Sequence, residues 1–297
     1  VRYSSFKSTR GLRGGQEEED RRNHFSLRQR AERQKQMGLL SNRVDRGSLK
    51  PGDHIYSWRT AYIYAHHGIY IGDDMVIHFT RGGQEVGTGT FIDVLLVSSG
   101  PANSQAACPV CEPLHERHGV VSSCLNCFLG SGVLYRFEYS VNPSLFLAKA
   151  RGGTCTLAPA DLPDAVIHRA IHLLDNGFGC YDVFKNNCED FAIYCKTGLL
   201  VLEQRGIGQS GQAVSIIGGP LAAVLSTPLR FMTTNVYGMV VVAASVYCAS
   251  RYAADIGMRR DVVKVPVEEL MKRLATGALL PLEPAPAGSP SMASPSG

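Results

Sequence analysis

The stretch Lys185-Asn186-Asn187-Cys188-Glu189-Asp190-Phe191-Ala192-Ile193-Tyr194-Cys195-Lys196-Thr197-Gly198 predicts a short helix whose two ends are both marked in the sequence. Either asparagine before Cys188 can cap the N-terminus, and the two acidic residues after it lie in the first turn, where the helix dipole favours negative charge. Gly198 follows a lysine of the last turn and marks the C-terminus. Cys188 therefore lies in the first turn, where free backbone N–H groups favour the thiolate form of a cysteine. The ordinary alternative for such a residue is a small buried apolar side chain.

The composition describes a globular protein of one large domain or two small ones. The 297 residues are 44% hydrophobic and 19% charged, with a formal net charge of +4. The basic residues are spread along the chain without a matching aromatic array, so we expect no nucleic-acid partner. The nine cysteines are odd in number and favour a reducing compartment, in which thiols act as metal ligands or nucleophiles.

Two runs of aromatic and β-branched residues flank the turn Gly72-Asp73-Asp74 and predict a β-hairpin. Side chains alternate between faces along a strand, so His66 and Gly68 share one face. With a three-residue loop, His78 lies opposite Gly68, on the same face as His66 and diagonal to it. A two-residue loop would move His78 to the other face, so the prediction depends on the register of the hairpin.

The pair formed by His66 and His78 is the arrangement that a cysteine nucleophile requires. One imidazole takes the thiol proton, and a further group orients that imidazole. Four other histidines are interpreted as hydrogen-bonded or surface side chains without a catalytic role: His54, His67, His168 and His172.

Three motifs in this order resemble the lecithin:retinol acyltransferase-like family: His66-His67-Gly68-Ile69-Tyr70-Ile71-Gly72, Val76-Ile77-His78 and Asn186-Asn187-Cys188-Glu189-Asp190-Phe191. The resemblance covers about half of the chain and is strongest to the plant members, often called NC-domain proteins. It implies that Cys188 is the nucleophile, His66 the general base and His78 the histidine that orients the base. Many relatives have a histidine where this chain has Asp190, which leaves the three catalytic roles in place but could alter acceptor specificity or activity.

The same resemblance implies a fold related to the NlpC-type papain-like peptidases in circularly permuted form. Antiparallel strands followed by helices also indicate an α+β protein by themselves, an antiparallel sheet with packed helices. Residues 132–139 predict a further strand and 153–157 a short one. Residues 162–176 carry apolar side chains at helical spacing and predict an amphipathic helix, and 265–274 predict a short surface helix.

The insertion at 102–130 contains two Cys-x-x-Cys pairs, twelve residues apart. Cys108, Cys111, Cys124 and Cys127 have the spacing of a tetrahedral four-thiolate zinc site, like a zinc knuckle. All four positions would be filled by protein, so the predicted zinc is structural and would supply folding energy to a segment with a small core. The alternatives are two redox pairs or unpaired thiols, with the intervening histidines as second-choice ligands. We expect no organic cofactor.

The remaining domain boundaries follow from composition. Residues 1–36 are poor in apolar side chains and predict a disordered extension. The resemblance implies that residues 45–200 form a lecithin:retinol acyltransferase-like catalytic domain. Residues 206–252 are apolar and predict helices that are either membrane-associated or buried, with flanking arginines favouring the membrane. Residues 278–297 are rich in proline, alanine and serine and predict a disordered tail.

The function expected from this resemblance is that of a thiol-dependent acyltransferase or phospholipase. Cys188 would attack a glycerolipid ester and form an acyl-thioester, so a phospholipid or other acyl-lipid is the expected substrate, at the cytoplasmic side of a membrane. One alternative is an NlpC-like cysteine peptidase or amidase with the same residues. Another is a non-catalytic, membrane-tethered scaffold that uses the metal module to bind partners.

Overall fold

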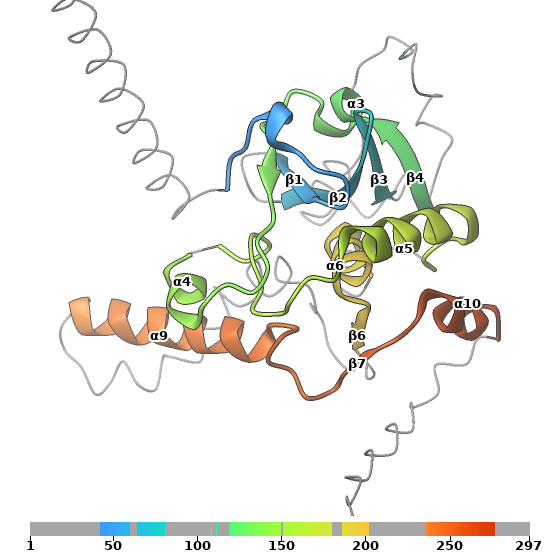
Figure 1. Ribbon diagram of the computed structural model, residues 1–297. Coiled ribbons are helices and arrows are strands. Elements are labelled where there is room, and N and C mark those ends of the chain that lie inside the picture. The colour runs from blue at the N-terminus through green and yellow to red at the C-terminus, as the bar shows by residue number, and fades with distance from the viewer. Residues whose placement is uncertain are drawn as a thin grey trace, which may run out of the picture.

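The architecture is taken from a computed structural model, which describes residues 42–59, 64–80, 108, 111, 119–149, 151–179, 186–201 and 236–276 (Figure 1). The predicted extension at 1–36, the tail at 278–297, most of the insertion before residue 119 and residues 206–235 of the apolar region lie outside the described residues.

The centre of the molecule is an antiparallel sheet with strand order β4-β3-β2-β1-β5. Its strands are listed in chain order: β1 (His54–Arg59), β2 (Tyr64–Gly72), β3 (Met75–Thr80), β4 (Gly119–Cys124) and β5 (Tyr135–Arg136). An antiparallel sheet combined with helices is the mixed architecture that the sequence predicts. The predicted strand at 132–139 is wrong in length, because only Tyr135 and Arg136 pair with β1 and Glu138 forms a single bridge to Cys155.

The hairpin of β2 and β3 has the predicted register, with His78 opposite Gly68, but reaches it by a different route. The loop has two residues, Asp73 and Asp74, whose φ angles of 50° and 55° are those of a type I′ turn. A register shift between Tyr70 and Gly72 marks a β-bulge that adds one residue to β2. A two-residue loop alone would have placed His78 on the other face of the sheet, and the bulge returns His78 to the face of His66.

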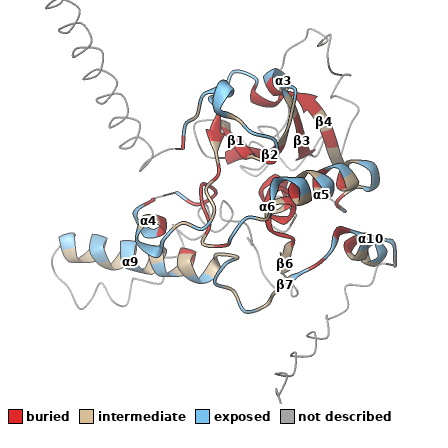
Figure 2. Ribbon diagram, viewed as in Figure 1, coloured by how far each residue is buried: buried red, intermediate tan, exposed pale blue. Residues whose placement is uncertain are grey.

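Helices α5 (Pro163–Asn176), α6 (Cys188–Thr197) and α10 (Val267–Thr276) form the main core with one face of the sheet. α5 has a proline in its first turn, a position that proline favours, and ends at Gly177. α6 is almost wholly buried (Figure 2). Sheet residues such as Ile69, Ile77 and Phe79 pack against these helices.

The expected surface helix at 265–274 is therefore only partly correct. α10 is a helix, but Val265, Val267 and Leu270 are buried in the main core, at 2%, 2% and 8% exposure. One face of α10 is apolar and the other is charged, so the pattern predicted the helix but not the partner that covers its apolar face.

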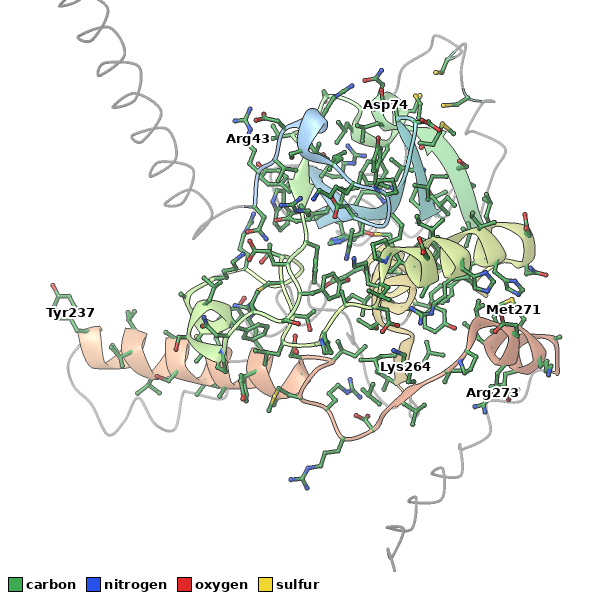
Figure 3. All side chains as sticks on the ribbon, in the orientation of Figure 1. Arg43, Asp74, Tyr237, Lys264, Met271 and Arg273 are labelled. Carbon is green, nitrogen blue, oxygen red and sulfur yellow. The ribbon has the colours of Figure 1, made fainter. Side chains whose placement is uncertain are left out.

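The opposite face of the sheet is covered by the short helix α3 (Leu125–Leu129), which follows β4 directly. Leu125 and Phe128 pack there with Ile55 and Val76. The Leu125 N–H donates to the Asp74 carbonyl oxygen, so the hairpin turn lies beside the start of α3 (Figure 3).

The other elements lie around this domain. They are the 3-10 helix η1 (Arg46–Ser48), α4 (Pro143–Ala148), the strand pair β6 (Leu199–Val201) and β7 (Val262–Lys264), and α9 (Val236–Ala254). α9 contacts α4 near its C-terminal half, and Tyr237 projects from its other end (Figures 1 and 3). Within the described ranges, no helix combines the length and the apolar character needed to cross a membrane.

Candidate active site

Cys188 is the first residue of α6, as the sequence predicts, and its side chain is fully buried. Asn187 caps the helix: its side-chain oxygen accepts hydrogen bonds from the backbone N–H groups of Glu189 (2.8 Å) and Asp190 (3.3 Å). The Asp190 carboxylate accepts in return from the Asn187 N–H at 3.1 Å, which completes a capping box. Two N–H groups that we expected to face the sulfur therefore donate to the cap.

The sulfur of Cys188 meets the start of β2. The Tyr64 hydroxyl and Cys188 Sγ share a hydrogen bond of 2.7 Å, and Sγ lies 3.8 Å from the carbonyl oxygen of Ala65. Tyr64 and His66 are two residues apart in one strand, so their side chains leave the same face of the sheet. The sulfur thus contacts two consecutive residues of β2, Tyr64 and Ala65, directly before His66 in the chain.

The two predicted histidines are in direct contact. His66 Nε2 and His78 Nδ1 are 2.9 Å apart, and His78 Nε2 lies 2.9 Å from Ser123 Oγ. All three side chains are buried, so Ser123, His78 and His66 form one hydrogen-bonded row across β4, β3 and β2. The outer ring nitrogen, His66 Nδ1, has no hydrogen-bond partner among the described residues.

Burial keeps both imidazoles neutral. Desolvation lowers the pKa of His78 to about 3, with a smaller effect from the positive charge of Arg59. Desolvation also lowers the pKa of His66 well below its usual value, and the neighbouring His78 and Arg59 add to the effect. A neutral imidazole with an unoccupied ring nitrogen is in the protonation state that a general base requires, while its lowered pKa weakens its affinity for the proton.

Arg59 brings a positive charge to the same face of the sheet. Its guanidinium donates to the carbonyl oxygens of Leu129, at 2.5 Å, and Phe128, at the end of α3. Burial lowers the pKa of Arg59, while the nearby Cys188 and Tyr64 act in the opposite direction. A cation close to a thiol stabilises its thiolate.

The other strand face carries a second histidine pair, for which the sequence predicts hydrogen-bonded or surface side chains without a catalytic role. His54 Nε2 lies 2.8 Å from His67 Nδ1, and His54 Nδ1 lies 2.7 Å from the Tyr139 hydroxyl. Both imidazoles are buried, and His67 Nε2 has no hydrogen-bond partner among the described residues. His168 is exposed and pairs with Glu268, in line with its interpretation as a surface side chain.

The four cysteines of the insertion lie together. The sulfur atoms of Cys108, Cys111, Cys124 and Cys127 are all within 4.8 Å of one another, so the cluster could hold a metal ion. The Cys124 N–H donates to Cys111 Sγ at 3.0 Å, and the Cys127 N–H donates to Cys124 Sγ at 3.5 Å. Such hydrogen bonds to sulfur accompany metal thiolate centres.

Sequence reasoning missed three residues of this site: Arg59, Tyr64 and Ser123. Tyr64 shares the strand face of His66, so the alternation that selected His66 could have found it. Ser123 and Arg59 reach the site only through the pairing of β4 and the position of α3, which no local pattern gives.

The fold and the site together define a class of protein. Its features are an antiparallel sheet, a cysteine at the start of a buried helix and a pair of histidines on a β-hairpin. Residues 47–201 match the model of the family described as lecithin retinol acyltransferase, and the chain belongs to this family. It is 75% identical over 248 residues to the protein LEAD-SENSITIVE 1 of Arabidopsis thaliana, a match that covers 84% of this chain and 96% of the relative. The chain is thus one of the plant NC-domain-type members.

Proposed function

We propose that this protein is a thiol-dependent acyltransferase or phospholipase that acts on glycerolipid esters through an acyl-thioester on Cys188. One observation carries the proposal: the Cys188 sulfur shares a hydrogen bond with Tyr64, whose side chain leaves β2 on the same face as His66, and His66 Nδ1 is buried without a partner in the described chain. Membership of the family favours acyl-transfer chemistry over the other reactions of a cysteine nucleophile.

The reaction would begin with proton transfer from the Cys188 thiol to His66. The sulfur then attacks the ester carbonyl carbon, and the alcohol leaves with the proton returned by His66, so that an acyl-thioester remains. Water, an amine or another alcohol takes the acyl group in the second half, with His66 accepting the proton of the incoming nucleophile and the thiol as leaving group. His78, bonded to Ser123, orients the base, and Arg59 stabilises negative charge near the sulfur.

We also propose that the fold is the circularly permuted papain-like fold of NlpC-type peptidases and that the four-cysteine cluster holds a structural Zn²⁺. Four thiolates with backbone N–H donors are a typical structural zinc set.

The name of the A. thaliana relative refers to sensitivity to lead. Thiolate ligands favour soft ions, and we propose that Pb²⁺ competes with Zn²⁺ for this cluster. Zinc that is released on titration with Pb²⁺, and lost from a Cys111→Ser variant, would support both assignments.

The membrane is the proposed location of the substrate, on the cytoplasmic side. Tyr237, Val240 and Val241 of α9 are exposed, at 81%, 62% and 63%, and offer apolar side chains to a lipid surface. Residues 206–252 would hold the enzyme at the bilayer. Binding to phosphatidylcholine vesicles that is lost on substituting these three residues by serine would support this location.

The decisive experiment is mass spectrometry of the full chain after incubation with phosphatidylcholine vesicles. The expected result is an acyl adduct on Cys188 that is absent from Cys188→Ala and from His66→Ala. Hydrolysis of peptide bonds without any acyl adduct would favour a peptidase or amidase. Absence of an adduct with phospholipid, ester and amide substrates alike would favour the scaffold, and turnover that persists in Cys188→Ala would refute the assigned nucleophile.

A further inference from the structure

The four-cysteine cluster is joined to the candidate active site by two consecutive residues of β4. Cys124 is the last residue of β4, and Ser123, the residue before it, is the hydrogen-bond partner of His78. We propose that a bound metal ion positions the two imidazoles, so that metal occupancy controls the reactivity of Cys188. This inference rests on the proposed function and extends it to the regulation of the same site.

The first connection runs through the strand. Ser123 is fully buried, its Oγ lies 2.9 Å from His78 Nε2, and His78 contacts His66 at the same distance. β4 is an edge strand of the sheet and pairs only with β3 in the described structure. An edge strand is held from one side, so a metal that fixes Cys124 also fixes the position of Ser123.

The second connection runs through α3. The Cys124 sulfur accepts a hydrogen bond from the Cys127 N–H and so caps this helix, which has only five residues. A helix of this length is not stable by itself, so it depends on its ends being held. Cys124 at the N-cap and Cys127, the third residue of α3, would be two ligands of the same ion and would hold the helix.

α3 in turn contacts both imidazoles and the arginine. The Phe128 ring centroid lies 5.2 Å from that of His66 and 5.4 Å from that of His78. The carbonyl oxygens at the end of the helix accept hydrogen bonds from Arg59. Displacement of α3 would therefore move the base, the residue that orients it and the nearby cation at once.

The cluster is also accessible enough to exchange its ion. Cys108, Cys111 and Cys127 are partly exposed, and only Cys124 is buried. Cys188, by contrast, is fully buried. The site is thus placed to respond to the supply of thiophilic divalent ions such as Zn²⁺.

The test compares the full chain loaded with Zn²⁺, loaded with Co²⁺ and stripped by a chelator. We expect one ion per chain, a thiolate-to-cobalt absorption band, and acylation of Cys188 that is about tenfold or more slower in the stripped protein, as for lost support of a metal or catalytic group. The vesicle concentration at half-maximal rate should stay unchanged, because substrate binding is not altered. Equal acylation rates with and without metal, in protein that melts above the assay temperature, would overturn the proposal.

Variants separate positioning from folding. Cys111→Ser should lose both zinc and the acylation rate, because it removes one of the four thiolate ligands. Cys248→Ser, a substitution on α9, is the matched cysteine control and should retain both. If the stripped protein unfolds, Ser123→Ala decides: it should bind zinc and acylate slowly, with Ser123→Thr recovering the rate, and a normal rate in Ser123→Ala would refute the connection.

Failure of the proposed function gives a different result. If Cys188 is not acylated in any form, the ring ¹⁵N signals of His78 still report on the connection. They should change when the metal is removed, because the bond to Ser123 is then lost. Unchanged signals would overturn the metal connection independently of any activity.

Discussion

Replacing Gly68 by alanine tests the geometry of the histidine pair with one methyl group. A Cβ built at Gly68 would lie 2.8 Å from Val76 Cγ1, 2.9 Å from Phe128 Cε2 and 3.1 Å from His78 Cβ. Carbon atoms pack at about 3.5–4.0 Å, so these neighbours must move by roughly half an ångström or more. Gly68 lies opposite His78 in the hairpin, so the displacement falls on the imidazole that orients His66.

The expected cost follows from these contacts. Over-packing a well-filled core lowers the free energy of unfolding by about 1–3 kcal/mol. At roughly 2–4 °C per kcal/mol for a domain of 150–250 residues, the melting temperature should fall by about 2–12 °C. Misplacement of a catalytic group by about 1 Å can reduce a rate by about a hundredfold, so half that displacement should slow acylation of Cys188 by about tenfold.

The assay combines thermal melting with the rate of acyl-adduct formation on Cys188. Gly47→Ala is the matched control, because a Cβ at Gly47 in η1 meets no atom within 4 Å. Val76→Ala removes the atom nearest to the new methyl group. The double variant should therefore lose less free energy of unfolding than the two single variants lose together, by at least about 0.5 kcal/mol. A Gly68→Ala protein with the normal melting temperature and the normal rate would refute this account of the site.

Three further outcomes follow from the same structure. Burial holds the pKa of both His67 and His78 at about 3, below the value of 6.5 in an unfolded chain. The unfolded chain therefore binds more protons between these values, so the free energy of unfolding should fall as the pH drops below about 6.5, by up to about 1.4 kcal/mol per pH unit for each histidine; identical melting temperatures at pH 7 and pH 5 would contradict this. Arg59→Lys cannot donate to two carbonyl groups in the same geometry and should slow acylation, while a rate equal to that of the unchanged protein would remove the arginine from the site. Asn187→Ala removes the cap of α6 and should lower the free energy of unfolding by about 0.5–2 kcal/mol in denaturant titration, a loss that Asn187→Asp should largely avoid.

The features that could be predicted from the sequence are those encoded by short-range signals. The capped start and the glycine end of α6 are local, and Gly198 adopts the left-handed conformation, with φ 69°, that such an ending favours. The spacing of the four cysteines is local as well, because a Cys-x-x-Cys pair brings two sulfur atoms together on one turn. The hairpin register was predicted correctly although the loop was assigned one residue too many, since the β-bulge compensates for the difference.

The features that could not be predicted depend on how distant segments pack. Ser123 reaches His78 only because β4 pairs with β3 across an insertion. The sequence around Ser123 contains no local signal for that pairing. The burial of α10 depends on the helices that cover it, although its apolar side is visible in the sequence. In each case the residue type was compatible with several environments, and tertiary contacts selected one.

The two histidine pairs show which kind of information identifies a catalytic group. Both pairs are buried, both have a lowered pKa, and each has one ring nitrogen without a partner in the described chain. Perturbed pKa and burial therefore do not distinguish His66 from His67. The contact made by the Cys188 sulfur does distinguish them, because the sulfur shares a hydrogen bond with Tyr64, whose side chain leaves the strand on the face of His66. The pair formed by His54 and His67 lies on the other strand face and is hydrogen-bonded to Tyr139.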